Sequence, residues 1–377
     1  MTVAIVAGLV GGFLLLLHLV GVGVVSRRLL RHGRRGTSPA PDASITVIRP
    51  ICGSENNLEA TLGSTFRIKA TDCEIIFCIA DARDPAIPLV RRLMALYPDV
   101  DARLLVGNET ISANPKLNNV VKGWRAARHD WIAMADSNVL MPPDYLSRLM
   151  AAWSPGTGLV CSPPIGCRPD GVWAELECAF LNTYQARWQC VADAFEFGFA
   201  QGKTMLFRRD ILDAHGGLAA LGAEPAEDAA ATKLIRNAGL KVRVVDAPFD
   251  QPLGQRSFAE VWGRQLRWAR LRRETFPWLY ALELLTGIVP SAVATSIFTT
   301  ALDGPVAASL IALTATWYAA EAALAAIGGW HLSWRSPVAS ILRDLLIPVL
   351  WMGSWIGNDF VWRGTAMTVA DQDGVAR

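Results

Sequence analysis

Four aspartates occupy positions at which a carboxylate could take part in catalysis. Asp81 and Asp84 follow the apolar segment CEIIFCIA, and Asp136 follows WIAMA. Asp228 lies at the start of EDAAATKLI, which has the composition of a helix. A carboxylate at the end of a strand can hold a divalent metal ion, and a second carboxylate can act as general base toward a hydroxyl. We predict Asp136 for the first role and Asp228 for the second, with Glu227 beside it as the reserve.

The elements that must position these acids alternate between strands and helices. We read strands in ITVIRP, CEIIFCIAD, DARLLV and WIAMAD, and helices in the segments between them, such as LNNVVKGWRAA. This alternation at short spacing predicts an α/β fold of Rossmann-like type, a mostly parallel sheet with helices on both faces. Ligands of such sheets bind at the carboxyl ends of the strands, which is where the acids lie.

Other parts of this chain are too apolar for a soluble enzyme. Hydrophobic residues make up 52% of its 377 residues and charged residues only 19%. Residues 3–25 form one apolar run followed at once by SRRLLRHGRR, which predicts an uncleaved anchor with its basic side in the cytoplasm. Three further apolar stretches, at 282–302, 306–328 and 338–362, bring the predicted spans to four. This orientation leaves the catalytic domain in the cytoplasm and the C-terminal tail outside.

Several charged residues fall inside the predicted spans, among them Glu283, Glu321, Arg343 and Asp344. Such groups are costly in hydrocarbon and therefore face protein, water or the headgroup layer. One explanation is structural pairing, such as Arg343 with Glu321. The other is a polar pocket that receives a lipid headgroup.

Residues 256–276 read as an amphipathic, arginine-rich helix. Its apolar side is formed by Phe258, Val261, Trp262, Leu266 and Ala269. Such a helix is expected to lie in the membrane interface, where its arginines could meet a diphosphate. The alternative is a basic helix that binds anionic lipid and nothing else.

Across residues 45–280 the succession of motifs resembles the ceramide glucosyltransferases and their bacterial relatives, which include processive enzymes of the GT-A fold. The motifs that carry the resemblance are DARDPAI, VDARLLVGN, NPKLNN, MADSN, RRDILDAHGGL, AEDAAATKLI and RQLRWARLRR. The resemblance implies a GT-A fold for the cytoplasmic domain and inverting transfer of a sugar from a nucleotide donor.

The resemblance also implies roles for single residues. The aspartate that holds the nucleoside in that family falls on Asp84, with Asp81 as a second candidate. The metal-associated aspartate falls on Asp136 and the catalytic base on Asp228. The (Q/R)xxRW motif of the family, expected at the diphosphate and the acceptor, falls on Arg264, Arg267 and Trp268.

Further residues are expected around the donor. Pro50 and Glu55 line the loop where nucleotides sit in this fold, Lys116 contacts the uracil or the phosphates, and Gly202 falls on the donor-sugar loop. Asp136 begins DSN, whereas many metal-dependent transferases carry DxD. Ceramide glucosyltransferases also lack the second acid, so we expect Mg²⁺ or Mn²⁺ to be held by one carboxylate and the diphosphate.

These features predict a multi-pass protein of a bacterial-type inner membrane, with its catalytic domain in the cytoplasm. The predicted parts are an anchor at 1–27, a basic linker at 28–43, a GT-A domain at 44–254, an interfacial helix at 255–280, three transmembrane helices at 281–363 and a tail at 364–377.

The resemblance implies a reaction that transfers a hexose, glucose from UDP-glucose, with inversion onto the hydroxyl of a membrane lipid, expected to be ceramide, which gives a β-glycolipid. Diacylglycerol and hopanoid alcohols are alternative acceptors. More distant alternatives are a polysaccharide synthase, which would need more spans for export, and a non-catalytic nucleotide-sugar sensor, which would lack the base. The expected partners are a UDP-sugar, a membrane lipid and the bilayer, and no nucleic acid.

Overall fold

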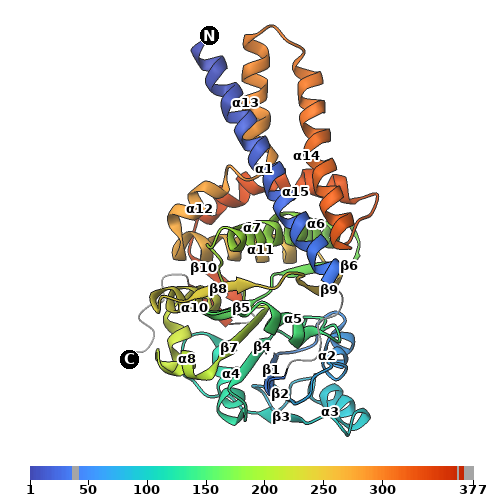
Figure 1. The fold of residues 1–377 in the computed structure, drawn as a ribbon, viewed down its shortest axis with the longest axis vertical. Helices are drawn as coiled ribbons and strands as arrows, with labels where there is room; N and C mark the ends of the chain where they lie inside the picture. The colour runs from blue at the N-terminus through green and yellow to red at the C-terminus, as the bar shows by residue number, and fades with distance from the viewer. Residues whose placement is uncertain (36–41, 363–364, 369–377) are drawn as a thin grey trace. The chain divides into compact units, whose positions relative to one another are not determined.

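The computed structural model describes residues 1–35, 42–362 and 365–368, and it separates into two compact units (Figure 1). The helical unit consists of Met1–Arg31, Pro169–Val191 and Gln255–Asn358. The sheet unit consists of the described residues of His32–Arg168, Ala192–Gly254 and Asp359–Arg377. The domain predicted over 44–254 therefore differs in one segment, because residues 169–191 group with the helical unit. Phe180 and Tyr184 of that segment pack there against Val261 and Ile347.

A seven-stranded sheet with the order β3-β2-β1-β4-β7-β5-β8 forms the centre of the sheet unit. Its strands are β1 Ile45–Ile51, β2 Cys73–Ile79, β3 Ala102–Val106, β4 Trp131–Ala135, β5 Thr157–Cys161, β7 Thr204–Arg208 and β8 Lys241–Val244. Only β7 runs antiparallel to its neighbours β4 and β5 within this sheet. The four predicted strands and the mostly parallel sheet are confirmed. A smaller pair joins β6 Pro164–Asp170 to β9 Phe249–Gln255.

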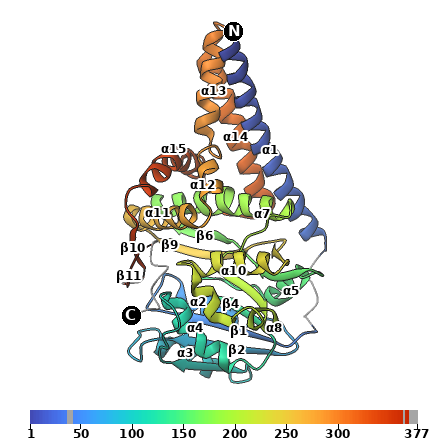
Figure 2. The same ribbon diagram turned by 90° about the vertical axis from the view of Figure 1, so that its left-hand side faces the viewer.

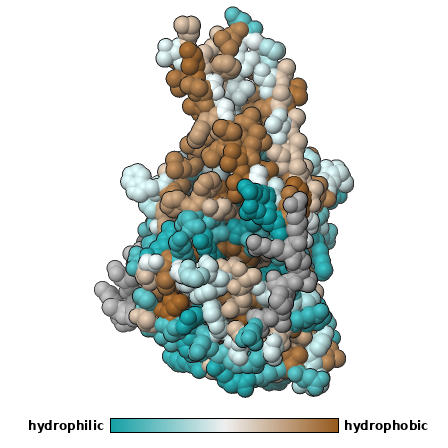
Figure 3. Space-filling model, viewed as in Figure 1, coloured by the Kyte–Doolittle hydropathy of each residue, from teal (hydrophilic) through white to brown (hydrophobic). Residues whose placement is uncertain are grey.

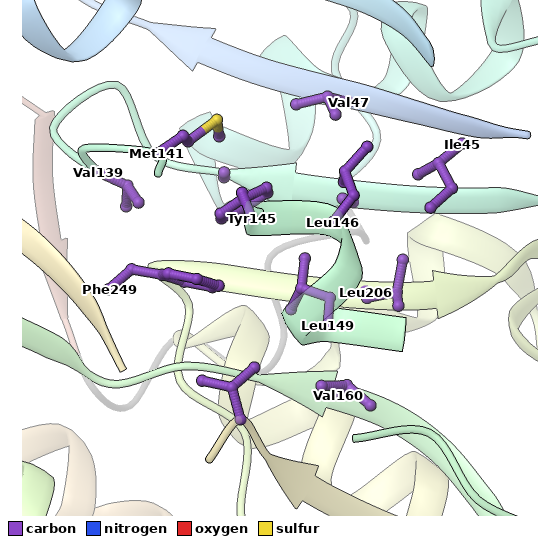
Figure 4. Close-up of a cluster of buried hydrophobic side chains, with 13 residues drawn as sticks. Ile45, Val47, Val139, Met141, Tyr145, Leu146, Leu149, Val160, Leu206 and Phe249 are labelled. Atoms are coloured by element: carbon purple, nitrogen blue, oxygen red, sulfur yellow. The ribbon is translucent and has the colours of Figure 1, made fainter. Parts of the chain in front are cut away.

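Helices cover both faces of this sheet, because alternate side chains of a strand point to opposite faces. The helices of the sheet unit are α2 Leu58–Thr65, α3 Ile87–Leu96, α4 Pro115–Ala126, α5 Tyr145–Ala151, α8 Arg209–Asp213, α9 Gly217–Ala220 and α10 Glu227–Asn237. Ile75 and Phe77 pack against α2 and α3. On the opposite face α4 approaches so closely that a Cβ on Gly123 would lie 2.6 Å from the Cys78 Sγ. Figure 4 shows the third contact, in which Leu146 and Leu149 of α5 pack into the core.

The helical unit contains the segments that could cross a membrane. Its helices are α1 Thr2–Arg35, α6 Val172–Ala179, a π-helical segment Phe180–Ala186, α7 Arg187–Ala194, α11 Phe258–Thr275, α12 Pro277–Glu283, α13 Ile288–Ala301, α14 Val306–Gly328 and α15 Ser336–Ser354. Among the described residues, α1, α14 and α15 are long and apolar enough to span a bilayer. α12 and α13, which are bent by 54° relative to each other, are together also long and apolar enough to span a bilayer. These helices are candidate membrane spans, and Figure 3 shows many hydrophobic residues on the surface over α1, α13 and α14.

Two predicted boundaries differ from the structure. The apolar stretch predicted to run to residue 362 ends as a helix at Ser354, and Asp359–Trp362 forms strand β10, paired antiparallel with β11 Thr365–Thr368. Gly357, with a positive φ of 76°, and Asn358 lie between the helix and this hairpin. The predicted basic linker begins inside α1, which continues to Arg35, and residues 36–41 lie outside the described residues, as do 363–364 and 369–377.

The predicted pairing of charges within the helical unit is confirmed. Arg343 of α15 donates from both terminal nitrogens to Glu321 of α14, with each distance 3.0 Å. It also pairs with the neighbouring Asp344 at 2.8 Å and donates to the Thr183 hydroxyl at 2.9 Å. Because both ions are buried, bidentate geometry and these extra hydrogen bonds are what offset the cost of removing them from water.

Candidate active site

Carboxylates and ammonium groups of the sheet unit gather where β4 ends and β7 begins. Asp136 directly follows β4, and Lys203 directly precedes β7. Because the two strands pair antiparallel, with Ala135 opposite Thr204, the end of one meets the start of the other. The Asp136 amide donates to the Lys203 carbonyl at 3.0 Å and fixes this junction.

Asp136 is held between two ammonium groups. Its Oδ1 lies 2.7 Å from the Lys116 Nζ, and its Oδ2 lies 3.0 Å from the Lys203 Nζ. Lys203 also donates to Asn138 at 3.2 Å. Burial opposes ionisation of Asp136, but the two lysines outweigh it and hold the pKa of this carboxyl below its usual value. Asp136 is therefore a carboxylate at any pH at which the enzyme would work.

Lys116 connects the junction to a second pair of acids. Its Nζ donates to the Glu227 Oε1 and to the Gly202 carbonyl, each at 2.7 Å, besides its contact with Asp136. Burial would lower the pKa of this ammonium, but Asp136 and Glu227 raise it above its usual value. The side chain of Asn114, at the N-cap of α4, accepts from the Lys116 amide at 2.9 Å and donates to Glu227 at 3.1 Å. The start of α4 is thus tied to the start of α10.

Asp228 lies beside Glu227 in the first turn of α10. Its Oδ2 accepts from the Gly202 amide at 2.9 Å, and its Oδ1 accepts from the Ala229 amide at 2.8 Å. Burial and then the negative charge of Glu227 raise the pKa of Asp228 to about 6, against the lowering effect of the Gly202 amide. A carboxylate with this pKa is mostly ionised at pH 7 and is a stronger base than an ordinary aspartate.

Gly202 lies directly beside the carboxylates of Glu227 and Asp228. A Cβ built on it would lie 2.7 Å from the Glu227 Oε1 and 3.4 Å from the Asp228 Oδ2. The first distance is shorter than a carbon and an oxygen tolerate, so a side chain here would push Glu227 away. Glycine at this position therefore permits the close approach of the backbone to both carboxylates.

The residues predicted at the nucleotide lie on the loops after β1 and β2. Asp84 accepts from the Gly53 amide at 2.7 Å and from the Ala86 amide at 2.8 Å, which joins the two loops. Asp81 is exposed, and the Arg83 amide, which lowers the pKa of Asp81, donates to it at 2.8 Å.

Two other predicted donor-site residues belong to the same end of the sheet. Pro50 is buried in β1, next to its last residue. Glu55 follows β1, and its Oε2 accepts from the Ser137 hydroxyl at 3.3 Å, so the loop after β1 reaches the residue beside Asp136.

Arg49 is a residue of this site that the sequence analysis did not single out. Fully buried in β1, it donates to the carbonyls of Asp136 at 2.7 Å and Val139 at 3.0 Å, and to the Thr65 hydroxyl at 2.6 Å. Burial lowers the pKa of its guanidinium to about 10. Arg49 thus fixes the turn that presents Asp136. An arginine within the largely apolar segment ITVIRP was the feature of the sequence that could have indicated this role. Lys203 was also missed, because nothing local indicates an antiparallel β7.

The predicted (Q/R)xxRW residues lie on α11 of the helical unit. α11 begins at a capping box formed by Ser257 and Glu260, as expected for a helix starting near residue 256. Arg264 forms an ion pair with Glu177 of α6, while Arg267 and Trp268 are half-buried. Their approach to a diphosphate stays a prediction.

The side chains around Asp136 offer few ligands for the predicted metal ion. Among the described residues there is no group of three or more His, Cys, Asp or Glu side chains that could hold a metal ion. Asp136 could offer an oxygen to Mg²⁺ or Mn²⁺ only alongside ligands from the diphosphate and water. Both of its oxygens already accept from ammonium groups, so Lys116 and Lys203 would compete with the metal.

The cluster lies at strand ends of a mostly parallel sheet, in one chain with helices that could span a membrane. Comparison with known families identifies this combination as a membrane-bound glycosyltransferase. The model described as glycosyl transferase family 21 matches residues 13–375. The chain belongs to that family, and the resemblance to ceramide glucosyltransferases is confirmed.

Three ceramide glucosyltransferases agree with this assignment in sequence. The chain is 28% identical to ceramide glucosyltransferase 3 of Caenorhabditis elegans, over 98% of this chain and 82% of the relative. It is 29% identical to ceramide glucosyltransferase 1 of the same organism over 66% of this chain, and 30% identical to ceramide glucosyltransferase of Komagataella phaffii over 55%. These two matches span 53% and 46% of the relatives. A mannosyltransferase from Pyrobaculum calidifontis, solved with GDP-mannose and Mn²⁺, aligns with a TM-score of 0.48 and 17% identity over 93% of this chain and 98% of that chain.

Proposed function

We propose that this glycosyltransferase moves glucose from UDP-glucose, with inversion, onto the hydroxyl of a membrane lipid, and that the lipid is ceramide. The observation that carries the proposal is the buried cluster in which Asp228, with its raised pKa, lies beside the Lys116 and Asp136 ion pair. The names of the curated relatives, all ceramide glucosyltransferases, support glucose as the sugar and ceramide as the acceptor. Diacylglycerol and a hopanoid alcohol are the alternative acceptors.

Asp228 acts as the general base in this proposal. Its carboxylate takes the proton of the acceptor hydroxyl, the hydroxyl oxygen forms a bond to the anomeric carbon, and the bond from that carbon to the β-phosphate oxygen breaks. The electron pair leaves with UDP. Because the attack and departure occur on opposite faces, an α-linked donor gives a β-glycoside. The amides of Gly202 and Ala229 hold the carboxylate in place for the proton transfer.

The leaving diphosphate needs positive charge, which this site can supply with its own residues. Lys116 and Lys203 are preorganised around Asp136, so their ammonium groups need little reorganisation to meet developing negative charge. A divalent metal bound through Asp136 would add Lewis-acid stabilisation of the same charge. Asp84, with Asp81, Pro50 and Glu55 near it, is proposed to hold the nucleoside.

The proposal places the protein in a bacterial-type inner membrane, with the sheet unit on the cytoplasmic side. UDP-sugars are charged and water-soluble, so the donor site must face the compartment that contains them, whereas a lipid acceptor arrives through the bilayer. Arg264, Arg267 and Trp268 on the interfacial α11 are proposed to meet the diphosphate and the lipid headgroup.

The test is transfer by the detergent-purified full chain. The protein is incubated with radiolabelled UDP-glucose, magnesium and, separately, ceramide, diacylglycerol or a hopanoid alcohol, and the lipids are separated by thin-layer chromatography. We expect a labelled glycolipid with ceramide, its loss in Asp228→Asn, and its retention in Asp210→Asn, which changes an exposed aspartate of α8 in the same way. Label on another lipid would correct the acceptor. No labelled lipid from UDP-glucose, UDP-galactose or UDP-N-acetylglucosamine would refute lipid glycosylation.

A further inference from the structure

α15 has the length and composition of a membrane span, but it packs on α6 and α11 within the helical unit. Leu350 and Ile347 contact Leu176 of α6 and Val261 of α11 through a shared apolar cluster. Figures 1 and 2 show α15 lying across the base of the bundle formed by α1, α13 and α14, whereas these three run side by side. The direction of α15 relative to the layer of α11 decides how often the chain crosses the bilayer.

The C-terminal end of α15 is fixed to the second half of α11. Arg270 donates to the Ile356 carbonyl at 2.6 Å, and Arg273 donates to the Asn358 side chain at 2.6 Å. Arg273 also donates to the carbonyl of Ser354, the last residue of α15. Residues that follow α15 therefore lie at the level of the α11 arginines.

The N-terminal end of α15 is fixed to the same layer through α6. His331 and Ser333, just before α15, contact the Glu175 carboxylate at 3.0 and 2.9 Å. Two residues further along α6, Glu177 pairs with Arg264 in the first half of α11. The C-terminal end of α15 is thus connected to α11 directly, and the N-terminal end is connected to α11 through α6.

Helix α11 cannot lie within hydrocarbon. Its sequence between residues 264 and 273 places five arginines in ten residues: Arg264, Arg267, Arg270, Arg272 and Arg273. An arginine is costly at the centre of a bilayer, so a helix that carries five of them belongs in the headgroup region. The C-terminal end of α15 contacts α11, and its N-terminal end contacts α6, which is itself paired with α11. A helix held in this way at both ends runs along that region and does not cross the bilayer.

The exposed face of α15 is suited to one leaflet. Its outward residues recur every three or four positions and are apolar, with exposed fractions from 39% to 62%: Val338, Ile341, Leu345, Val349 and Met352. Trp334 before the helix is 81% exposed and Trp355 after it is 52% exposed, and tryptophan favours the boundary between headgroups and acyl chains. Because the stripe is apolar and tryptophans lie at both of its ends, we assign the acyl region of the adjacent leaflet as its occupant.

We propose that α15 is an in-plane helix whose apolar stripe contacts a single leaflet, so that the chain crosses the bilayer three times and its C-terminal end lies on the same side as the sheet unit. The described residues of 359–368 group with the sheet unit, in agreement with this sidedness. The proposal replaces the four spans and the outside tail expected from hydropathy. It is independent of the proposed reaction.

The first test is the sidedness of the two ends of the full chain. Epitope tags are placed at the N-terminus or the C-terminus, and sealed membrane vesicles of known orientation are treated with protease before and after detergent. We expect the two tags to be cleaved in vesicles of opposite orientation, with the C-terminal tag cleaved together with the sheet unit. Cleavage of both tags from the same side would overturn the proposal.

The second test measures depth. Nitroxide labels are attached to Val338→Cys or Met352→Cys in a Cys52→Ser background, which removes the exposed cysteine. The two sites are 14 residues apart, about 21 Å along the helix axis. An in-plane helix gives both labels the same depth in power-saturation measurements, whereas a span separates them by about 20 Å. Ile311→Cys and Ile327→Cys on α14 are the matched control, for which a separation of about 24 Å is expected.

Discussion

Asp228 should give this enzyme an acidic limb in its pH–rate profile. Its pKa is raised to about 6, so about 91% of the base is ionised at pH 7 and about 9% at pH 5. We expect kcat/KM for lipid glycosylation to fall about tenfold between those values. In Glu227→Gln the negative charge that raises this pKa is removed, so the limb should move to lower pH. Asp210→Asn should leave the profile unchanged, and a wild-type limb below pH 4.5 would refute the assignment.

The same shift predicts how stability depends on pH. The pKa of Asp228 rises from 3.8 to about 6 on folding, which corresponds to roughly 2–3 kcal/mol at 1.36 kcal/mol per unit. Because the folded pKa is raised, its contribution to stability is complete below pH 3.8 and is lost as pH rises through 6. Asp228→Asn should therefore raise the Tm at pH 8 and have little effect at pH 4, as measured by tryptophan fluorescence in detergent. A Tm difference between the two proteins that does not change with pH would refute a raised pKa for the buried Asp228 carboxyl.

Three further changes test the surroundings of this base. Gly202→Ala should reduce kcat more than tenfold without unfolding the protein, because its Cβ would meet the Glu227 Oε1 at 2.7 Å; normal activity in the purified variant would contradict the close packing. Lys203→Met should weaken UDP binding in calorimetry and lower the magnesium concentration needed for half-maximal activity, since the ammonium competes for Asp136; an unchanged magnesium requirement would exclude that competition. Arg49→Met should lower stability by about 2–4 kcal/mol, because buried carbonyls lose a charged donor, and thermal unfolding at wild-type temperature would contradict this.

Local sequence patterns were sufficient for the first four strands and for the position of two aspartates after them. The apolar segments that became β1 to β4 alternate with helical segments, and their ends carry Asp84 and Asp136 as predicted. The arginine-rich helix α11 could also be predicted from the sequence, since its periodicity and its capping box depend only on residues close together in the chain. Pairing of Arg343 with Glu321 followed from the cost of charge in hydrocarbon.

Tertiary structure decided which of these groups meet. Strand β7 inserts antiparallel between β4 and β5, and this non-local pairing brings Lys203 to Asp136 from 67 residues away. Lys116, Glu227 and Gly202 meet for the same reason, because the starts of α4 and α10 are joined only in the folded sheet unit. The composition of α15 is equally suitable for a span or an in-plane helix, and only its contacts with α6 and α11 distinguish them. Periodicity records which face of an element is buried, whereas the partner on that face is fixed by the packing of the whole chain.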